Sequence, residues 1–300
     1  MSNSLEKKLK FFERGRRAYQ KYSGISTDSY HCPICMKPFS KKNLQDGLLT
    51  VEHVPPKSQG GKEICLTCQS CNNMLGSTID VQVANREEVL KASALLSENE
   101  SFDGNLEFSF GRIGSGLNAH VVKNTDNLRV YFERQHNNPR TLENLLHCDQ
   151  IHMSPIKFST KKRYNQHLAN VGYLKSAYLI CFSTFGYTYA FDKNLENIRR
   201  QITEYSIKYL DGFIVRSRSK LFDANSFFCV SSPIKAFSVC INNTTVILPW
   251  PSFFSEDDIY SYLSSAYTAK SKIDFFGLKL EWPRSLSLRW DYEREPQSVI

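Results

Sequence analysis

The sequence has no long uncharged apolar run, and this absence argues against a membrane-spanning segment. A membrane helix needs about 18 or more such residues, whereas the longest apolar stretch here, residues 173–189, is interrupted by Lys175 and Gly186. The first residues are charged and lack the apolar core of a secretion signal. Phosphate-binding loops of the Walker or dinucleotide type are also missing. We therefore expect a cytoplasmic protein that carries no nucleotide-driven motor of its own.

The formal net charge is +8 at pH 7, and positive side chains are concentrated near the start of the chain. Residues 1–24 contain seven Lys or Arg and two Glu. A basic helix suits a polyanion such as nucleic acid, although a helix face exposed to solvent would have the same composition. Arg14, Arg16 and Arg17 are therefore candidates for contacts with nucleic-acid phosphates.

The cysteines are unevenly spread, with five of the nine lying between Cys32 and Cys71. In a reducing compartment such a cluster favours metal binding over disulfides. Two C-x2-C pairs stand out, Cys32 with Cys35 and Cys68 with Cys71, and two such pairs suit a closed tetrahedral zinc site. Cys65 offers a second pairing with Cys68, but it lies in a strand-like run and fits a buried thiol better. A redox dithiol would not need the second pair.

The hydrophobic patterns predict an α+β protein. Expected helices cover residues 5–22, 79–98, 161–185 and 195–209, with a short one near Ser255, and the helix at 161–185 should run into a strand. Expected strands cover residues 48–54, 62–68, 106–110, 119–122, 128–132, 227–230, 236–241, 245–248, 272–282 and 285–290, mostly in antiparallel arrangements. Composition changes suggest three parts: a basic helix (1–30), a zinc-stapled domain (31–100) and a mixed α+β domain with antiparallel strands (101–300).

The stretch LLTVEHVPPKSQGGKEICLTCQSCNN, residues 48–73, lies within the cysteine-rich block of residues 31–78. It contains an acidic residue followed by histidine at a strand end, a loop with Pro-Pro and Gly-Gly, and a cysteine knuckle followed by asparagine. With the two cysteine pairs, this arrangement resembles the HNH endonuclease family, the ββα-metal nucleases, and in particular a group of bacterial HNH proteins. The resemblance covers about residues 31–80.

The resemblance implies roles for several residues. His53 would be the general base, because an imidazole titrates near neutral pH and can take a proton from the attacking water. Glu52 and Asn72 would hold a catalytic Mg²⁺ or Mn²⁺, with Asn73 as a rival to Asn72. Asn72 could instead be only a helix N-cap. Lys57 and Lys62 flank the loop and could contact phosphates beside the cut, or be ordinary loop lysines.

The sequence departs from the family pattern at three points. Glu52 stands where the family usually has Asp. The segment before the second strand lacks the Asn that tethers the loop, so we expect another tether there. Gly76 occupies the place where some members have a further His ligand. Consecutive strand residues also face opposite ways, so Glu52 and His53 can share a site only if the strand end is twisted.

The resemblance implies a divalent-metal-dependent endonuclease that cuts DNA and also carries structural zinc. By analogy its setting would be restriction or phage defence, with residues 101–300 in target recognition or regulation and with an activating partner protein or ligand. Two alternatives stay open: a non-catalytic zinc module that binds nucleic acid or a protein, and an RNase or nicking enzyme with the same site. The sequence leaves the oligomeric state open.

Overall fold

The structure is a computed structural model. It describes residues 3–93, 95, 101–110, 114–124, 127–147, 156–160, 162–215, 225–252, 255 and 258–283. The chain forms two compact units, one made of Met1–Val83 with His167–Ile300 and the other of Ala84–Gln166. The boundary between them falls inside helix α4, Val81–Ser93. Each unit has a hydrophobic core of its own.

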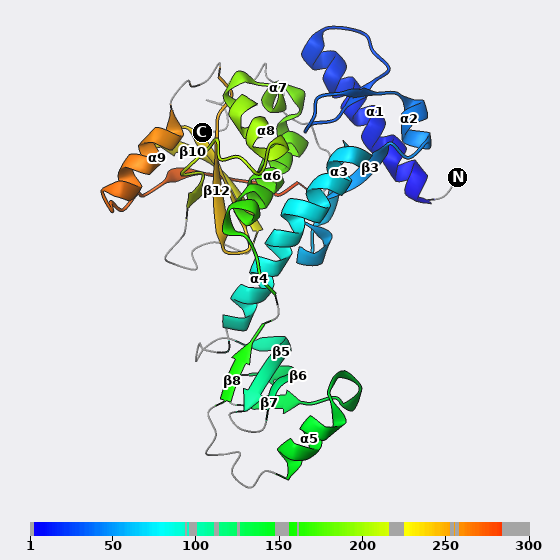
Figure 1. The fold of residues 1–300 in the computed structure, drawn as a ribbon. Helices are drawn as coiled ribbons and strands as arrows, with labels where there is room; N and C mark the ends of the chain where they lie inside the picture. Colours follow the sequence, from blue (N-terminus) through cyan, green and yellow to red (C-terminus); the bar gives the residue numbers. More distant parts are fainter. Residues whose placement is uncertain are drawn as a thin grey trace. The chain divides into compact units, whose positions relative to one another are not determined.

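The first unit begins with a long helix and a short two-stranded hairpin (Figure 1). Helix α1 spans Asn3–Ser23, the short strands β1 and β2 span Tyr30–His31 and Pro38–Phe39, and α2 spans Lys41–Gln45. Strands β3 (Leu49–Val54) and β4 (Lys62–Cys68) pair antiparallel. Helix α3 (Gln69–Leu75) follows, and a π-helical turn, Gly76–Asp80, joins it to α4. The predicted order of strand, loop, strand and helix is confirmed.

Helix α6, Gln166–Phe185, is the central element of the first unit and is buried along most of its length. The sequence predicted a strand after it, which was wrong. Gly186, with φ of +76°, ends α6, and the chain forms a second short helix, α7 (Tyr187–Ala190), because its aromatic side chains pack back into the same core. Helix α8 (Glu196–Thr203) comes next. Within the described part of the chain, no helix is long and apolar enough to cross a membrane.

A five-stranded antiparallel sheet completes the first unit, in the order β13-β10-β11-β12-β9. Its strands span Ile214–Val215 (β9), Asn225–Ser232 (β10), Ala236–Ile241 (β11), Thr244–Pro249 (β12) and Phe276–Leu280 (β13), and α9 spans Ile259–Thr268. Figure 1 shows α6 and α8 against this sheet, and the rings of Phe185 and Phe237 lie 4.6 Å apart. The predicted strand at 285–290 lies outside the described residues.

The second unit contains a four-stranded antiparallel sheet in the order β7-β6-β5-β8. The strands span Phe102–Phe110 (β5), Gly114–Lys123 (β6), Leu128–Tyr131 (β7) and Ile156–Ser159 (β8), and helix α5 spans Pro139–Leu146. Alternate residues of β5, among them Leu106 and Phe108, face the core. The meander predicted from residues 106–132 is confirmed, with β8 added at its edge.

One hydrophobic core joins the cysteine-rich segment to the later part of the first unit. Phe12 of α1, Leu66 of β4 and Phe182 of α6 belong to the same buried cluster. The Tyr178 hydroxyl donates to the carbonyl oxygen of Pro33 (2.6 Å), and the Tyr187 hydroxyl donates to that of His31 (2.6 Å). The compact units therefore do not follow the predicted boundaries at residues 31 and 101. A short zinc-stapled segment buries little apolar surface alone, and α6 supplies the missing part.

Candidate functional site

The two cysteine pairs meet in the fold. The sulfur atoms of Cys32, Cys35, Cys68 and Cys71 all lie within 4.8 Å of one another. Cys68 caps the start of α3, where its sulfur accepts from the Cys71 N–H (3.4 Å), and its own N–H donates to the Cys32 sulfur (3.4 Å). Cys65 is fully buried but lies outside this cluster. The prediction that Cys32, Cys35, Cys68 and Cys71 come together, without Cys65, is therefore confirmed.

The cluster suits a zinc ion. Burial raises the pKa of the Cys32 thiol, so a thiolate there needs a cation beside it. Four sulfur donors without an open position form the ligand set of structural zinc, and the N–H groups that point at two of the sulfurs add to the stabilisation of negative charge. The four cysteines could thus hold zinc, while the identity of the ion stays a prediction.

The β3–β4 hairpin carries a bulge at the position that matters for the candidate site. Glu52 pairs with Cys65, whereas His53 pairs with Glu63, so Ile64 is an extra residue in β4. The loop between the strands turns back on itself at Gly61. A Cβ atom there would meet the Pro55 carbonyl oxygen at 1.5 Å, so only glycine allows this close approach. This close approach fixes the conformation of the loop that closes the β3–β4 hairpin, and His53 lies near that loop.

His53 is half-buried, with 28% of its side chain exposed, and it faces a carboxylate. Its Nε2 lies 3.5 Å from Oε1 of Glu63 on the paired strand. Glu63 also forms an ion pair with Lys7 of α1. The hydrogen bond from Lys7 lowers the pKa of Glu63, which keeps this carboxylate ionised beside the imidazole at neutral pH. The sequence reasoning did not name Glu63, and the expected tether of the loop stays a prediction.

Replacing Glu63 with glutamine should slow any reaction that uses His53 as a base by roughly threefold to tenfold. A neutral amide stabilises the imidazolium less than a carboxylate does, so the rate should fall. The lowered pKa of Glu63 also means that its pairing with Lys7 stabilises the fold above the unfolded-state pKa and is lost as pH falls through the folded-state pKa. Rate profiles of both proteins test this, and superimposable profiles would remove Glu63 from the site.

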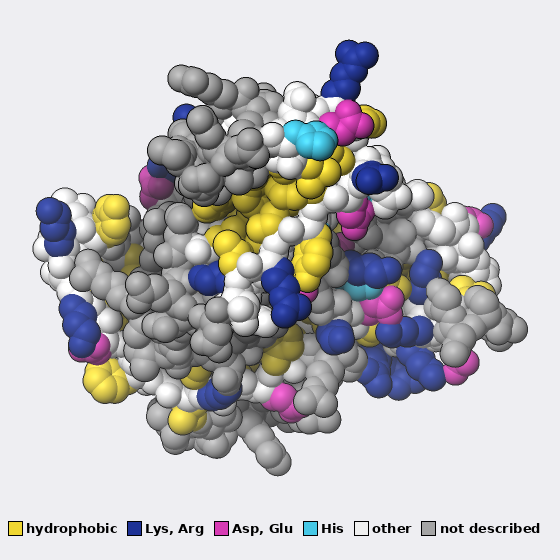
Figure 2. Space-filling view, turned by 90° about the horizontal axis from the view of Figure 1, so that it is seen from below, with side chains coloured by type: hydrophobic (Ala, Val, Ile, Leu, Met, Phe, Trp, Pro, Cys, Tyr) yellow, Lys and Arg dark blue, Asp and Glu magenta, His cyan; other side chains and the backbone are white. Residues whose placement is uncertain are grey.

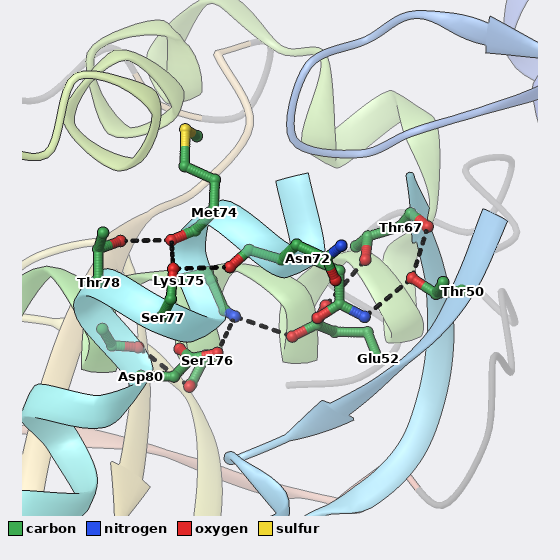
Figure 3. A network of polar contacts seen from close by, with 12 residues as sticks. Thr50, Glu52, Thr67, Asn72, Met74, Ser77, Thr78, Asp80, Lys175 and Ser176 are labelled. Carbon is green, nitrogen blue, oxygen red and sulfur yellow. Dashed lines mark hydrogen bonds and ion pairs between the residues drawn. The ribbon is translucent and has the colours of Figure 1, made fainter. Parts of the chain in front are cut away.

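Glu52, the residue before His53 on β3, is only 2% exposed, and Figure 3 shows its carboxylate among side chains of neighbouring elements. Its Oε1 accepts from the Lys175 ammonium of α6 (2.8 Å), and its Oε2 accepts from the Thr67 hydroxyl of β4 (2.8 Å). Lys175 also donates to Oδ2 of Asp80 (2.6 Å). Both oxygens of Glu52 are therefore engaged by protein groups.

One ammonium and two carboxylates thus share a buried site. Burial by itself would lower the pKa of Lys175, but the charges of Glu52 and Asp80 raise it above its usual value, so the ammonium keeps its proton. Burial raises the pKa of Asp80. The other oxygen of Asp80, Oδ1, is buried and has no hydrogen-bond partner in the described part of the chain.

Asn72 connects α3 to β3. Its Nδ2 donates to the Thr50 hydroxyl (2.8 Å) and to the Val51 carbonyl oxygen (3.4 Å). With the nitrogen so engaged, Oδ1 is the atom that Asn72 could offer to a metal. The N-cap of α3 is Cys68, so Asn72 does not fill that role. Asn73, the rival, is exposed.

A catalytic divalent ion fits these residues less well than zinc fits the cysteines. Among the described residues, the cysteine cluster is the one group of three or more His, Cys, Asp or Glu that could hold a metal. Mg²⁺ keeps several waters, whereas the Glu52 carboxylate is buried and bound by Lys175 and Thr67. Glu52 as placed here does not fit a hydrated ion. The ligand roles of Glu52 and Asn72 therefore stay predictions.

The basic side chains of α1 form an exposed stripe. Residues spaced by three or four positions lie on one face of a helix, and five exposed side chains follow this spacing: Lys7, Lys10, Arg14, Arg17 and Lys21. Arg16 points elsewhere and pairs with Glu13 (3.0 Å) and Asp28 (3.6 Å). Lys57 and Lys62 are exposed at the hairpin loop. Figure 2 shows Lys and Arg side chains gathered on one side of the view, with a histidine and acidic groups among them.

Comparison with known proteins identifies the segment that contains this site. Residues 32–87 match the family model described as HNH endonuclease. The match includes the four cysteines, the β3–β4 hairpin and Asn72, whereas Lys175 and the basic stripe of α1 lie outside it. The search of curated proteins and the search of solved structures found no match. The segment-limited resemblance to HNH endonucleases is therefore confirmed.

Proposed function

We propose that this chain is a divalent-metal-dependent endonuclease that hydrolyses phosphodiester bonds in DNA, with His53 as the general base. The observation that carries the proposal is the placement of His53. It is partly exposed at the end of β3, and it faces an ionised carboxylate within a segment that matches HNH endonucleases. A histidine with a carboxylate partner and access to solvent has the arrangement of a base that activates water.

The reaction requires His53 to take a proton from a water molecule as that water attacks phosphorus. Glu63 would hold the imidazole in place and stabilise the imidazolium that forms, since the two groups are 3.5 Å apart. The family chemistry supplies a divalent ion that stabilises negative charge on the phosphate. Asn72, through its Oδ1, is the proposed ligand that the structure leaves available, whereas Glu52 could join it only by giving up its contact with Lys175 or Thr67. Zinc at the four cysteines would keep the hairpin and α3 together.

The basic stripe of α1 supports nucleic acid as the substrate. Lys7 at its start contacts Glu63, which in turn contacts His53, so the stripe begins beside the proposed base. Contacts with phosphates position a nucleic acid without reading its sequence. Arg14 and Arg17 in the stripe, together with Lys57 and Lys62 at the loop, are the residues proposed to bind the backbone.

The proposal extends to the other parts of the chain. Residues 84–166 form a compact unit with a core of its own, which supports a role in target recognition or regulation. The proposed setting is restriction or phage defence in the cytoplasm. In this setting the nuclease would stay inactive until an activating partner protein or ligand binds.

A substrate panel tests the proposed function. Supercoiled plasmid, linear duplex, single-stranded DNA and RNA are incubated with the zinc-loaded protein and either Mg²⁺, Mn²⁺ or no added divalent ion. We expect DNA to be cut only when the divalent ion is present. Cleavage of RNA without cleavage of any DNA would make the chain an RNase. Binding of DNA without cleavage under all conditions would favour a non-catalytic zinc module.

A further inference from the structure

Lys175 is a charged side chain in the middle of a buried helix. Only 1% of its side chain is exposed, although α6 is apolar on almost all sides. Burying an ammonium costs several kcal/mol unless its partners are well placed. Its two partners, Glu52 and Asp80, both come from the segment that matches HNH endonucleases, whereas Lys175 comes from a helix outside that match. Lys175 thus connects α6 to the segment that matches HNH endonucleases.

The connection fixes the strand end that carries His53. The Glu52 carboxylate is held at one oxygen by Lys175 of α6 and at the other by Thr67 of β4, so it ties three elements together (Figure 3). The residue after Glu52 on β3 is His53, and the ladder is interrupted by the bulge between these two positions. A bulge loosens the regular pairing of a strand end. The anchored carboxylate holds the strand end in place despite the bulge.

We propose that Lys175 is a positioning residue of the nuclease site, which holds Glu52 from the core side of β3 and thereby sets the place of His53. This inference rests on the proposed function for its catalytic consequence. The contact by which Lys175 holds Glu52 does not depend on whether the protein is a nuclease. The helix that completes the site thus comes from the chain beyond the second unit, and residues 32–87 alone do not contain everything that the site needs.

Stability alone does not account for Lys175. Replacing a whole buried ion pair or triad by apolar residues is often neutral or stabilising when packing is kept, so apolar residues at all three positions, Lys175, Glu52 and Asp80, could serve the core equally well. What an apolar residue could not do is hold the Glu52 carboxylate at a fixed point, because that carboxylate needs a cation or a hydrogen-bond donor.

The test compares Lys175→Met with Ser176→Ala in the full-length, zinc-loaded protein. Ser176 is the next residue of the same buried helix, and its hydroxyl donates only to the helix carbonyl of Gly172 (3.0 Å). Plasmid cleavage gives kcat and KM, and the NMR resonances of the His53 ring at one fixed pH report its surroundings. We expect Lys175→Met to lower kcat by about tenfold or more, with KM nearly unchanged, because small misplacements of a base are costly. The His53 ring resonances should move in this variant and stay unchanged in Ser176→Ala.

Several outcomes would overturn the proposal. A folded, zinc-loaded Lys175→Met protein with the kcat and the His53 ring resonances of the wild type would do so directly. If Lys175→Met does not fold, the double variant Lys175→Met/Asp80→Asn takes its place, because it removes one positive and one negative charge together. If the double variant also fails to fold while Ser176→Ala folds, Lys175 is a structural residue and the proposal is rejected. If the wild type cuts no nucleic acid, the proposed function fails separately, and the His53 ring resonances at fixed pH decide the positioning role.

Discussion

DNA cleavage by a His53→Ala variant is expected to be slower than that of the wild type by roughly a hundredfold or more. Alanine cannot accept the proton of the attacking water. The fold should be kept, because His53 is partly exposed and its contact with Glu63 lies at the surface. Conversion of supercoiled plasmid, measured for both proteins at equal zinc content, gives the ratio of rates.

The control for this experiment is His120→Ala. His120 is an exposed histidine of β6 in the second unit, and it faces the carboxylate of Asp103 at 3.3 Å. It therefore resembles His53 in its chemistry but lies outside the segment that matches the family. We expect this variant to cleave at the rate of the wild type. Equal cleavage by the His53→Ala protein would mean that the base is another residue or that the activity is a contaminant.

Replacing Cys71 with serine is expected to lower the stability of the fold strongly. Cys71 lies in the first turn of α3, buried beside the other three cysteines, so its loss opens the metal site and releases the helix from the hairpin. Zinc binding and folding are coupled in sites of this kind. We expect zinc content well below one ion per chain and a thermal midpoint lower by roughly 10 °C. Elemental analysis and a thermal melt measure the two effects.

Cys65→Ala is the matched control for the metal site. Cys65 is buried like Cys71, but it lies in β4 and its sulfur is not part of the cluster. The change removes one buried sulfur atom and should lower stability by only about 1 kcal/mol, with zinc content unchanged. If the Cys71→Ser protein keeps a full equivalent of zinc, the four cysteines are not the zinc site.

The features that the sequence predicts well are those that depend on local spacing. The two C-x2-C pairs can converge because each pair is a short knuckle, and the strands of the hairpin alternate in a regular way around a Pro- and Gly-containing loop. The meander of the second unit is predictable for the same reason. The helix α7 was missed because Tyr187 and Tyr189 favour strands in general, whereas here their packing in the core decides the conformation.

The contacts around the candidate site could not be predicted, because they join residues that are far apart in the chain. Lys175 and Glu52 meet only when α6 packs behind the hairpin. A signal was present, since a single lysine in the apolar stretch 173–189 requires a partner, but the sequence does not say which. The partner of His53 was equally hidden, because the bulge at Ile64 decides that Glu63 lies opposite.

The hydrogen bonds from Tyr178 and Tyr187 to the first cysteine knuckle have a consequence for biosynthesis. The ribosome adds about 5–20 residues per second, so α6 and α7 follow the last knuckle cysteine by on the order of ten seconds. During this interval a nascent chain already has all four zinc ligands but lacks the helix that covers its apolar face and supplies Lys175. A prematurely terminated chain would stay in that state. An incomplete translation product would therefore lack both the hydrogen bonds from Tyr178 and Tyr187 and the contact between Lys175 and Glu52.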